Sequence, residues 1–259
     1  MMKTALKILF IIPVLYLVGL PVFMTVKGKK TPCSDIVITI KDSADYGFVS
    51  KRDILNIISG TAGRVTGRQV GDIPVNEIET NLYRLRELKS ADVFTTVDGV
   101  LHVVADQREP IMRVRGGDGV DYYVDEEGIV FRKRTIQSPR LHLVSGNIVI
   151  SRKMMEGVSV LDTAIKRTIL RDIYYLVSYI RSDGFWSAQI DQIYVDGNDE
   201  IDLIPRAGNH TVHLGTAENF VEKLRNLRVF YEEVLPEVGW NKYSVINLAF
   251  RDQIVCKRR

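Results

Sequence analysis

Residues 107–131 read Gln-Arg-Glu-Pro-Ile-Met-Arg-Val-Arg-Gly-Gly-Asp-Gly-Val-Asp-Tyr-Tyr-Val-Asp-Glu-Glu-Gly-Ile-Val-Phe, and this stretch decides how the chain is divided. Two runs of β-prone residues, 122–125 and 129–133, flank a short Glu-Glu-Gly segment, which predicts a β-hairpin. The hairpin opens a second region with its own pattern of elements. We therefore expect two folded domains, residues 35–108 and residues 109–259.

The first domain has the predicted order strand, helix, helix, strand, strand. β-branched residues alternate over 35–41 and predict the first strand. The first helix has Ser50 as its N-cap. The second begins at Pro74 and keeps apolar residues at helical spacing as far as Leu88.

The two remaining strands of this domain, 91–97 and 100–107, are joined by Asp98-Gly99, a strong hairpin signal. Two amphipathic helices cover only one face of a three-stranded sheet. We therefore expect at least one open sheet edge in this domain.

The second domain is predicted to be a mainly antiparallel sheet with two packed helices, so that the whole chain is α+β. The helices are expected to run from Leu161 to the residue before Asp183, and from Asn219 to Leu235. After the hairpin, the predicted strands of this sheet are 141–144, 188–195, 200–205, 211–214 and 243–256.

Residues 5–26 are almost entirely apolar and are long enough to span a membrane. No small-residue cleavage site follows them, so we favour a transmembrane helix over a cleaved signal peptide. Residues 1–4 are then a short cytoplasmic tail and residues 27–34 a linker. The lysines after the span oppose this orientation by the positive-inside rule, but a short N-terminal tail usually stays inside. We expect extracytoplasmic domains on a single-pass membrane protein.

The composition excludes several classes of protein. The 259 residues are 46% hydrophobic and 26% charged, which is neither a disordered nor a disulfide-framework composition. The net charge of +3 is too small to indicate a nucleic-acid-binding protein. The two cysteines, Cys33 and Cys256, are expected to be unpaired.

No constellation of residues indicates catalysis. The sequence has no Gly-x-Ser-x-Gly, Walker or Ser-x-x-Lys motif. His210 and His213 would point to opposite faces of a strand, which disfavours a metal site. We expect the carboxylates of residues 125–127 to be solvated at a turn, and the glycine-rich residues 115–120 to form another turn. The sequence thus predicts a protein that is not an enzyme and has no cofactor and no metal.

The quoted stretch carries a resemblance to a known family. The segments Gln107-Arg108-Glu109-Pro110, Tyr122-Tyr123-Val124-Asp125 and Gly128-Ile129-Val130-Phe131 resemble the domain junction of FtsQ, a bacterial cell-division family called DivIB in Gram-positive bacteria. The elements of residues 35–108 look like a POTRA domain, a module that binds other polypeptides. The family's architecture is a cytoplasmic tail, one membrane span, a POTRA domain and a β domain.

This resemblance implies a non-enzymatic scaffold of the division machinery, or divisome, in the inner membrane at the division site. The implied partners are FtsB-like and FtsL-like single-span proteins, with which the family helps to regulate septal peptidoglycan synthesis. Other division proteins are implied as partners of the POTRA domain. The alternatives are a POTRA-containing subunit of a protein export or assembly machine and, from another class, a membrane-tethered cell-wall hydrolase.

The resemblance also implies where partners bind. In the family, FtsB is thought to add a strand beside the last strand of the β domain, a mode known as β-augmentation. Family members often carry Asp-Leu-Arg-aromatic there, which becomes Asn247-Leu248-Ala249-Phe250 in this chain and so lacks the ion-pairing arginine. Arg251 would point to the opposite face. We expect Phe250 either to anchor the partner or to pack in the core.

The predicted partner-binding positions fall into two sets. The set on the C-terminal strand is Ser244, Val245, Ile246, Asn247, Leu248, Ala249, Phe250, Arg251, Gln253 and Val255. The set on the POTRA edge strand is Val93, Thr95 and Val97.

Overall fold

The computed structural model describes residues 30–41, 47–132 and 139–259. The chain divides into two compact units, Met1–Gln107 and Arg108–Arg259. The predicted span at 5–26 and the tail before it lie outside the described residues. Within the described residues, no helix has the length and apolar character needed to cross a membrane.

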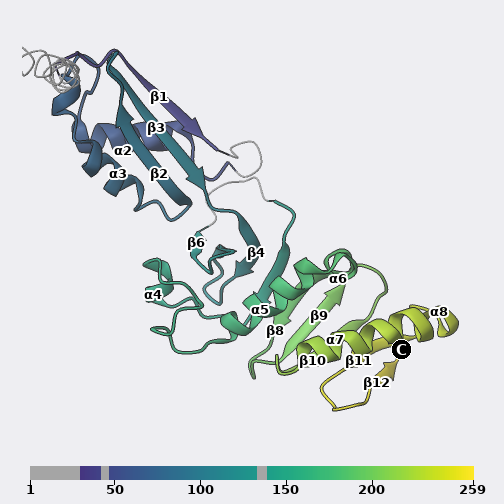
Figure 1. Ribbon diagram of the computed structural model, residues 1–259. Helices are drawn as coiled ribbons and strands as arrows, with labels where there is room; N and C mark the ends of the chain where they lie inside the picture. Colours follow the sequence, from purple (N-terminus) through teal and green to yellow (C-terminus); the bar gives the residue numbers. More distant parts are fainter. Residues whose placement is uncertain (1–29, 42–46, 133–138) are drawn as a thin grey trace, which may run out of the picture. The chain divides into compact units, whose positions relative to one another are not determined.

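The N-terminal unit is a three-stranded sheet with two helices on it (Figure 1). Its elements are β1 (Asp35–Ile40), α2 (Lys51–Ala62), the 3₁₀ turn η1 (Val70–Asp72), α3 (Val75–Leu82), β2 (Leu88–Thr95) and β3 (Val100–Gln107). The strand order is β1-β3-β2, with β1 parallel and β2 antiparallel to β3. The helices bury one apolar face each, through Ile54 and Ile58 in α2 and Ile78 and Leu82 in α3.

Local signals account for most of this unit. Ser50 caps α2 as predicted, in a capping box in which its hydroxyl accepts from the Asp53 N–H and the Asp53 carboxylate accepts from the Ser50 N–H. The second helix is shorter than predicted: it ends at Leu82, and Leu88 opens β2. Leu88 is buried, as Leu82 of α3 is, so the helical spacing of the leucines did not reveal that the helix ends before Leu88.

The C-terminal unit is one nine-stranded sheet in the order β12-β11-β10-β9-β8-β7-β4-β5-β6. Its strands are β4 (Pro110–Arg115), β5 (Asp121–Asp125), β6 (Val130–Arg132), β7 (His142–Gly146), β8 (Ile190–Val195), β9 (Ile201–Pro205), β10 (Thr211–Gly215), β11 (Tyr243–Asn247) and β12 (Val255–Arg258). The pairs β4–β7, β7–β8 and β10–β11 are parallel and the other neighbouring pairs antiparallel, so the sheet is mixed but mainly antiparallel.

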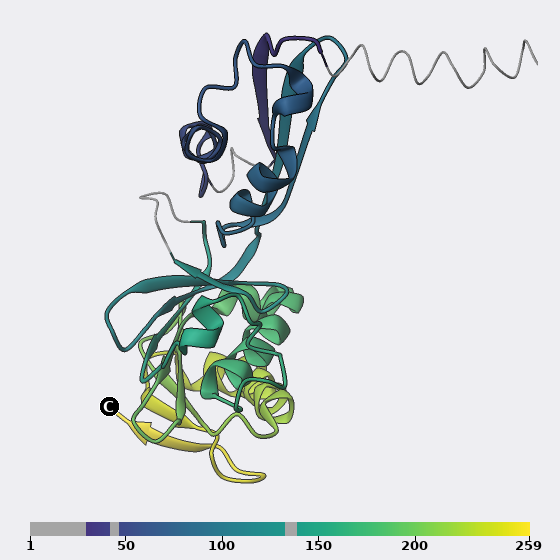
Figure 2. The same cartoon turned by 90° about the vertical axis from the view of Figure 1, so that its left-hand side faces the viewer.

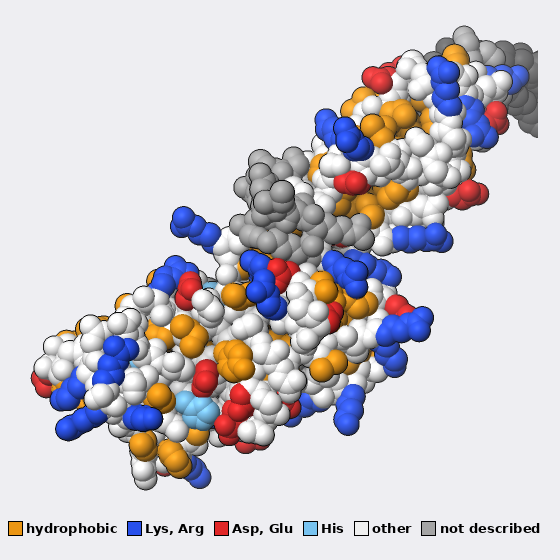
Figure 3. Space-filling model, turned by 180° about the vertical axis from the view of Figure 1, so that it is seen from behind, with side chains coloured by type: hydrophobic (Ala, Val, Ile, Leu, Met, Phe, Trp, Pro, Cys, Tyr) orange, Lys and Arg blue, Asp and Glu red, His pale blue; other side chains and the backbone are white. Residues whose placement is uncertain are grey.

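Helices of this unit pack beside the sheet and bury its core (Figure 2). They are α4 (Arg152–Met155), α5 (Ile169–Ser182), α6 (Gly184–Gln189), α7 (Phe220–Val229), the π-helical turn η2 (Phe230–Val234) and α8 (Leu235–Val238). The predicted helix at Asn219–Leu235 is therefore a run that continues through three elements to Val238. Acidic and basic side chains are interspersed on the surface drawn in Figure 3, as the small net charge leads one to expect.

The long predicted helix begins later than expected, at Ile169 instead of Leu161. The guanidinium of Arg171 donates to the carbonyl oxygens of Val160 (2.8 Å) and Asp162 (2.5 Å). This side chain therefore holds the preceding segment in a non-helical path against the helix. Ile165 of that segment is still buried, which explains why the apolar spacing looked continuous.

The predicted single strand over 243–256 is wrong. Strand β11 ends at Asn247, a seven-residue loop follows (248–254), and β12 returns antiparallel to β11. The Asn247 side chain accepts from the Ala249 N–H at 2.8 Å, an Asx-type turn that interrupts the strand. Asp252 has a φ of 58°, a left-handed conformation that lets the chain reverse.

Candidate functional site

Strand β12 forms one end of the nine-stranded sheet. Among the described residues it pairs only with β11, through Tyr243–Arg258, Val245–Lys257, Ile246–Cys256 and Asn247–Val255. Its outer side therefore presents backbone groups that are free to pair with another strand. The strand is short and half-exposed to exposed throughout, so a partner would meet it without unfolding the sheet.

Strand β11 is placed differently from the prediction. It is paired on both sides, with β10 in parallel and with β12 in antiparallel register. The predicted positions Ser244, Val245, Ile246 and Asn247 therefore lie in an internal strand, whose backbone cannot accept an added strand. The edge belongs instead to the last residues of the chain, of which the prediction included only Val255.

The loop between these strands holds the rest of the predicted C-terminal positions. Leu248 is buried, and its N–H donates to the His213 carbonyl at 2.8 Å, which extends the pairing of β11 with β10. Phe250 is 55% exposed, so the alternative that it packs in the core is wrong. The side chain of Arg251 is 96% exposed, and Gln253 is exposed as well.

A groove of about 230 Å³ separates this loop from the first part of α7. Lys223 crosses from α7 to the end of β10 and donates to the carbonyl oxygens of Leu214 (2.9 Å) and Thr216 (2.8 Å). Burial lowers the pKa of this lysine. The groove is lined by Thr216, Glu218, Asn219, Glu222, Lys223, Asn226 and residues 248–254.

The edge strand is basic. Lys257 and Arg258 lie on β12, and Arg259 follows it with a hydrogen bond from its guanidinium to the Asn209 carbonyl oxygen. Cys256 is a free, half-buried thiol opposite Ile246, and burial raises its pKa. A strand pairing with β12 would thus meet two or three positive charges, which favours a partner with acidic side chains.

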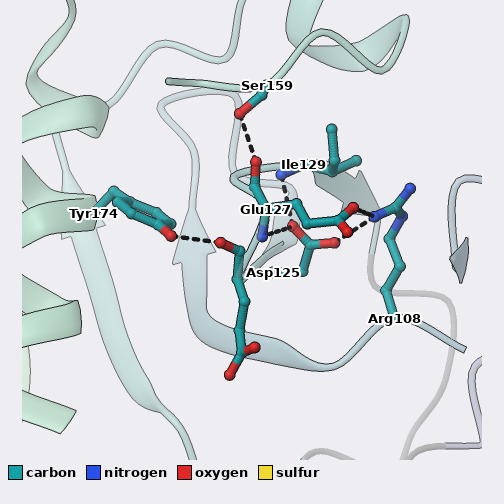
Figure 4. Close-up of polar contacts among 7 residues, drawn as sticks. Arg108, Asp125, Glu127, Ile129, Ser159 and Tyr174 are labelled. Atoms are coloured by element: carbon teal, nitrogen blue, oxygen red, sulfur yellow. Dashed lines mark hydrogen bonds and ion pairs between the residues drawn. The ribbon is translucent and has the colours of Figure 1, made fainter. Parts of the chain in front are cut away.

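The stretch quoted at the start forms a polar cluster around Arg108 (Figure 4). The guanidinium Nη1 of Arg108 lies 2.6 Å from Asp125 Oδ2 and 2.8 Å from Glu127 Oε2. The other oxygen of Asp125 accepts from the backbone N–H groups of Glu127 (3.0 Å) and Ile129 (2.7 Å). The prediction of a turn at residues 125–127 is confirmed, but Asp125 is buried and not solvated, because it pairs with Arg108.

Neighbouring segments fix this turn from outside. Ser159 donates to the Glu127 carbonyl at 2.6 Å, and Tyr174 of α5 donates to the Glu126 carbonyl at 2.5 Å. Gly128 has a φ of 74°, and a Cβ there would lie 2.6 Å from Ser159 Oγ, so only glycine fits. The cluster joins four segments of the unit, at Arg108, at the turn after β5, at Ser159 and in α5, which is a structural role.

The POTRA edge strand matches the prediction in part. Strand β2 is at the sheet edge, but Val93 is buried toward the helices and Val97 lies in the turn after the strand, not in it. The outward side chain that the prediction missed is Phe94, which is 47% exposed and stacks on His102 at 5.1 Å. The alternation of side chains along the strand was the signal that placed Phe94 outward. Thr95 is half-buried.

The two predicted strand histidines have separate structural partners. His210 is buried and its Nε2 lies 2.7 Å from the Tyr231 hydroxyl, whereas His213 Nδ1 lies 2.7 Å from Asp202. In the part of the chain that the structure describes, no group of three or more His, Cys, Asp or Glu side chains is arranged to hold a metal ion.

Comparison with known proteins gives two family matches. The family described as "FtsQ/DivIB, C-terminal related" matches residues 109–257, and the family described as "POTRA-like domain" matches residues 31–105. No curated protein matches the chain. The first match covers more than half of the 259 residues, and the second lies within the N-terminal unit.

Proposed function

The chain belongs to the FtsQ/DivIB family, and from this premise we propose that it is a non-enzymatic scaffold of the bacterial divisome. FtsQ/DivIB proteins are division-site membrane proteins. The proposed role is to bind other membrane-anchored division proteins, FtsB-like and FtsL-like, and so to help regulate septal peptidoglycan synthesis. The POTRA-like unit would contact further division proteins.

The observation that carries the proposal is the open outer side of β12. An added strand gains backbone hydrogen bonds that are independent of its sequence, while alternate side chains supply specificity. The basic residues of β12 select an acidic strand. The groove beside α7 and the exposed Phe250 offer a place for an apolar side chain of the partner. Neither feature needs the arginine that family members often carry at residue 249.

In-cell photo-cross-linking tests this proposal. A photoreactive amino acid replaces Val255 on the edge strand or, as the control, Val149, an exposed valine outside every helix and strand. Cross-linked proteins are identified by mass spectrometry. We expect FtsB-like or FtsL-like single-span proteins from position 255 only. Equal yields at both positions, or export-machinery proteins alone, would contradict the proposal.

A further inference from the structure

A hollow of about 700 Å³ in the C-terminal unit is surrounded by three arginines and a single carboxylate. We call it the arginine hollow, and it lies outside the β12 edge and its groove. Its wall is made by Arg140, Leu141, His142, Arg181, Ser187, Asp191 and Arg206. With a neutral histidine, three arginines against one aspartate leave two positive charges in excess.

The residues of the arginine hollow come from separate segments of the chain. Arg140 and His142 stand before and at the start of β7, Arg181 is in the last turn of α5, Ser187 is in α6, and Arg206 directly follows β9. The fold of the unit, not a local sequence motif, therefore brings the guanidinium groups together. Like charges gathered around one hollow repel each other, which an anion would relieve.

Two of the arginines are held in place. The main-chain N–H of Arg206 donates to the Gln189 carbonyl at 2.7 Å, and its Nε lies 3.1 Å from Asp191 Oδ1. Arg181 donates to the Ile111 carbonyl at 3.4 Å, a long contact that leaves its other N–H groups available. No hydrogen bond or ion pair holds Arg140 among the described residues, so its full charge faces the hollow or solvent.

His142 provides an independent sign that the hollow is incomplete. Its side chain is buried, and Nε2 has no hydrogen-bond partner within the described residues. A hydrogen bond joins the ring to the backbone of Ile190. Burial lowers the pKa of His142, and the charges of Arg181 and Arg206 lower it further.

We propose that the arginine hollow binds a doubly charged phosphate-class oxyanion, held by Arg140, Arg181 and Arg206. Guanidinium groups offer paired N–H donors that match the oxygens of a phosphate, and such charge-assisted bonds are strong. A charge of two balances the excess of the wall. The Ser187 hydroxyl, a neutral donor in the same wall, can bind a further oxygen.

Occupancy of the arginine hollow has a signature at His142. Arg181 and Arg206 act on the ring with positive charge, Asp191 acts on it with negative charge, and Arg140 lines the same hollow. A bound oxyanion neutralises part of the positive charge and so raises the pKa of His142. By linkage, a protonated His142 in turn strengthens binding of the anion.

The test uses the full-length chain in a non-ionic detergent, with sodium pyrophosphate as the probe in isothermal titration calorimetry. We expect saturable one-to-one binding that weakens roughly tenfold or more in the variant Arg140→Gln/Arg206→Gln. Both side chains are exposed, so the fold should persist, as checked by circular dichroism. The matched control is Arg167→Gln/Arg225→Gln, which removes two exposed arginines elsewhere in the same unit.

A second readout is the titration of the His142 ring by NMR, which four histidines per chain make assignable. Pyrophosphate should raise the pKa of His142 in the unaltered chain and not in the double variant. Equal affinity in the double variant, or an unchanged His142 pKa at saturation, would overturn the proposal.

The same oxyanion chemistry has two sources, a free phosphate compound and the headgroup of an anionic lipid. Short-chain phosphatidic acid, kept below its critical micelle concentration, is titrated in parallel with pyrophosphate. If the lipid binds more tightly than pyrophosphate and its binding depends on the arginines, the site takes a lipid headgroup. If pyrophosphate binds more tightly, the site takes a free phosphate compound. Failure of both probes to bind would overturn it.

Discussion

The guanidinium of Arg108, the first residue of the C-terminal unit, lies 2.6 Å from the buried carboxylate of Asp125 across the β4–β5 hairpin. The two side chains are only 14% and 4% exposed. The pair therefore ties the entry of the chain into this unit to the turn after β5. The same turn is bound by Tyr174 of α5, so the pair is part of the framework on which the nine-stranded sheet is built.

Replacing Asp125 with alanine should destabilise the C-terminal unit by about 3 kcal/mol, because Arg108 would keep a poorly solvated charge and two backbone N–H groups would lose their acceptor. Urea unfolding followed by tryptophan fluorescence measures this unit specifically, since both tryptophans, Trp186 and Trp240, belong to it. The control is Asp196→Ala, because Asp196 accepts from two backbone N–H groups in the same way but pairs with no arginine among the described residues. Equal losses of unfolding free energy in the two variants would show that the ion pair with Arg108 does not stabilise the unit.

Reversing the charges of the edge strand should weaken partner binding. The variant Lys257→Glu/Arg258→Glu should lower affinity for the captured partner roughly tenfold, mainly through slower association, and the loss should shrink at high salt. Surface plasmon resonance at two salt concentrations measures both effects. The control is Lys166→Glu/Arg167→Glu, which reverses the charges of two adjacent basic residues outside the edge strand. An unchanged association rate for the edge variant would show that the basic residues of β12 do not select the partner.

Phe250 should matter for binding and not for folding. Since its ring is 55% exposed, Phe250→Ala should change the free energy of unfolding by less than about 0.5 kcal/mol. If the ring anchors the partner, the dissociation constant should rise roughly thirtyfold. Tyr194→Ala, a variant at a similarly exposed ring on β8, should leave binding unchanged. Unaltered binding in the Phe250 variant would move the anchor elsewhere.

Acid should destabilise the C-terminal unit. Burial lowers the pKa values of both His142 and His210 below the ordinary value of 6.5, so the folded unit binds fewer protons than the unfolded chain as pH falls. The stability gained from keeping these two histidines neutral is complete above the pKa of histidine in the unfolded chain. It is lost as the pH falls below 6.5. Unfolding free energies measured from pH 7.5 down to about 5.5 should therefore decrease. In the variant His142→Gln/His210→Gln, the free energy of unfolding should fall less steeply with decreasing pH. An equally steep fall would contradict the assignment of the acid sensitivity to these histidines.

Local signals in the sequence predicted the elements that depend on neighbouring residues. The N-cap at Ser50 and the turn before Gly128 both appear as expected, because each is decided within about four residues. The edge position of β2 also followed from the resemblance to a POTRA domain. The resemblance added the family, which the matches of both family descriptions confirm.

Features that depend on distant partners were not predicted. The burial of Asp125 requires Arg108, which lies 17 residues away, and nothing in a turn sequence signals that pairing. The C-terminal hairpin was missed because residues 243–256 alternate like one strand, although Asn247 and Asp252 are ordinary turn formers. The arginine hollow was invisible for the same reason, since three separate segments of the chain contribute its arginines.

The most direct test of the central claim is hydrogen–deuterium exchange of the full-length chain, alone and with the partner captured by cross-linking. We predict that the amides of β12, residues 255–258, exchange at least roughly tenfold more slowly in the complex, because the added strand would bond the open edge. Strand β6 (Val130–Arg132), the opposite edge of the same sheet, is the internal control and should be unchanged. Protection at β6 or elsewhere with none at β12 would contradict the claim that β12 is the partner-binding edge.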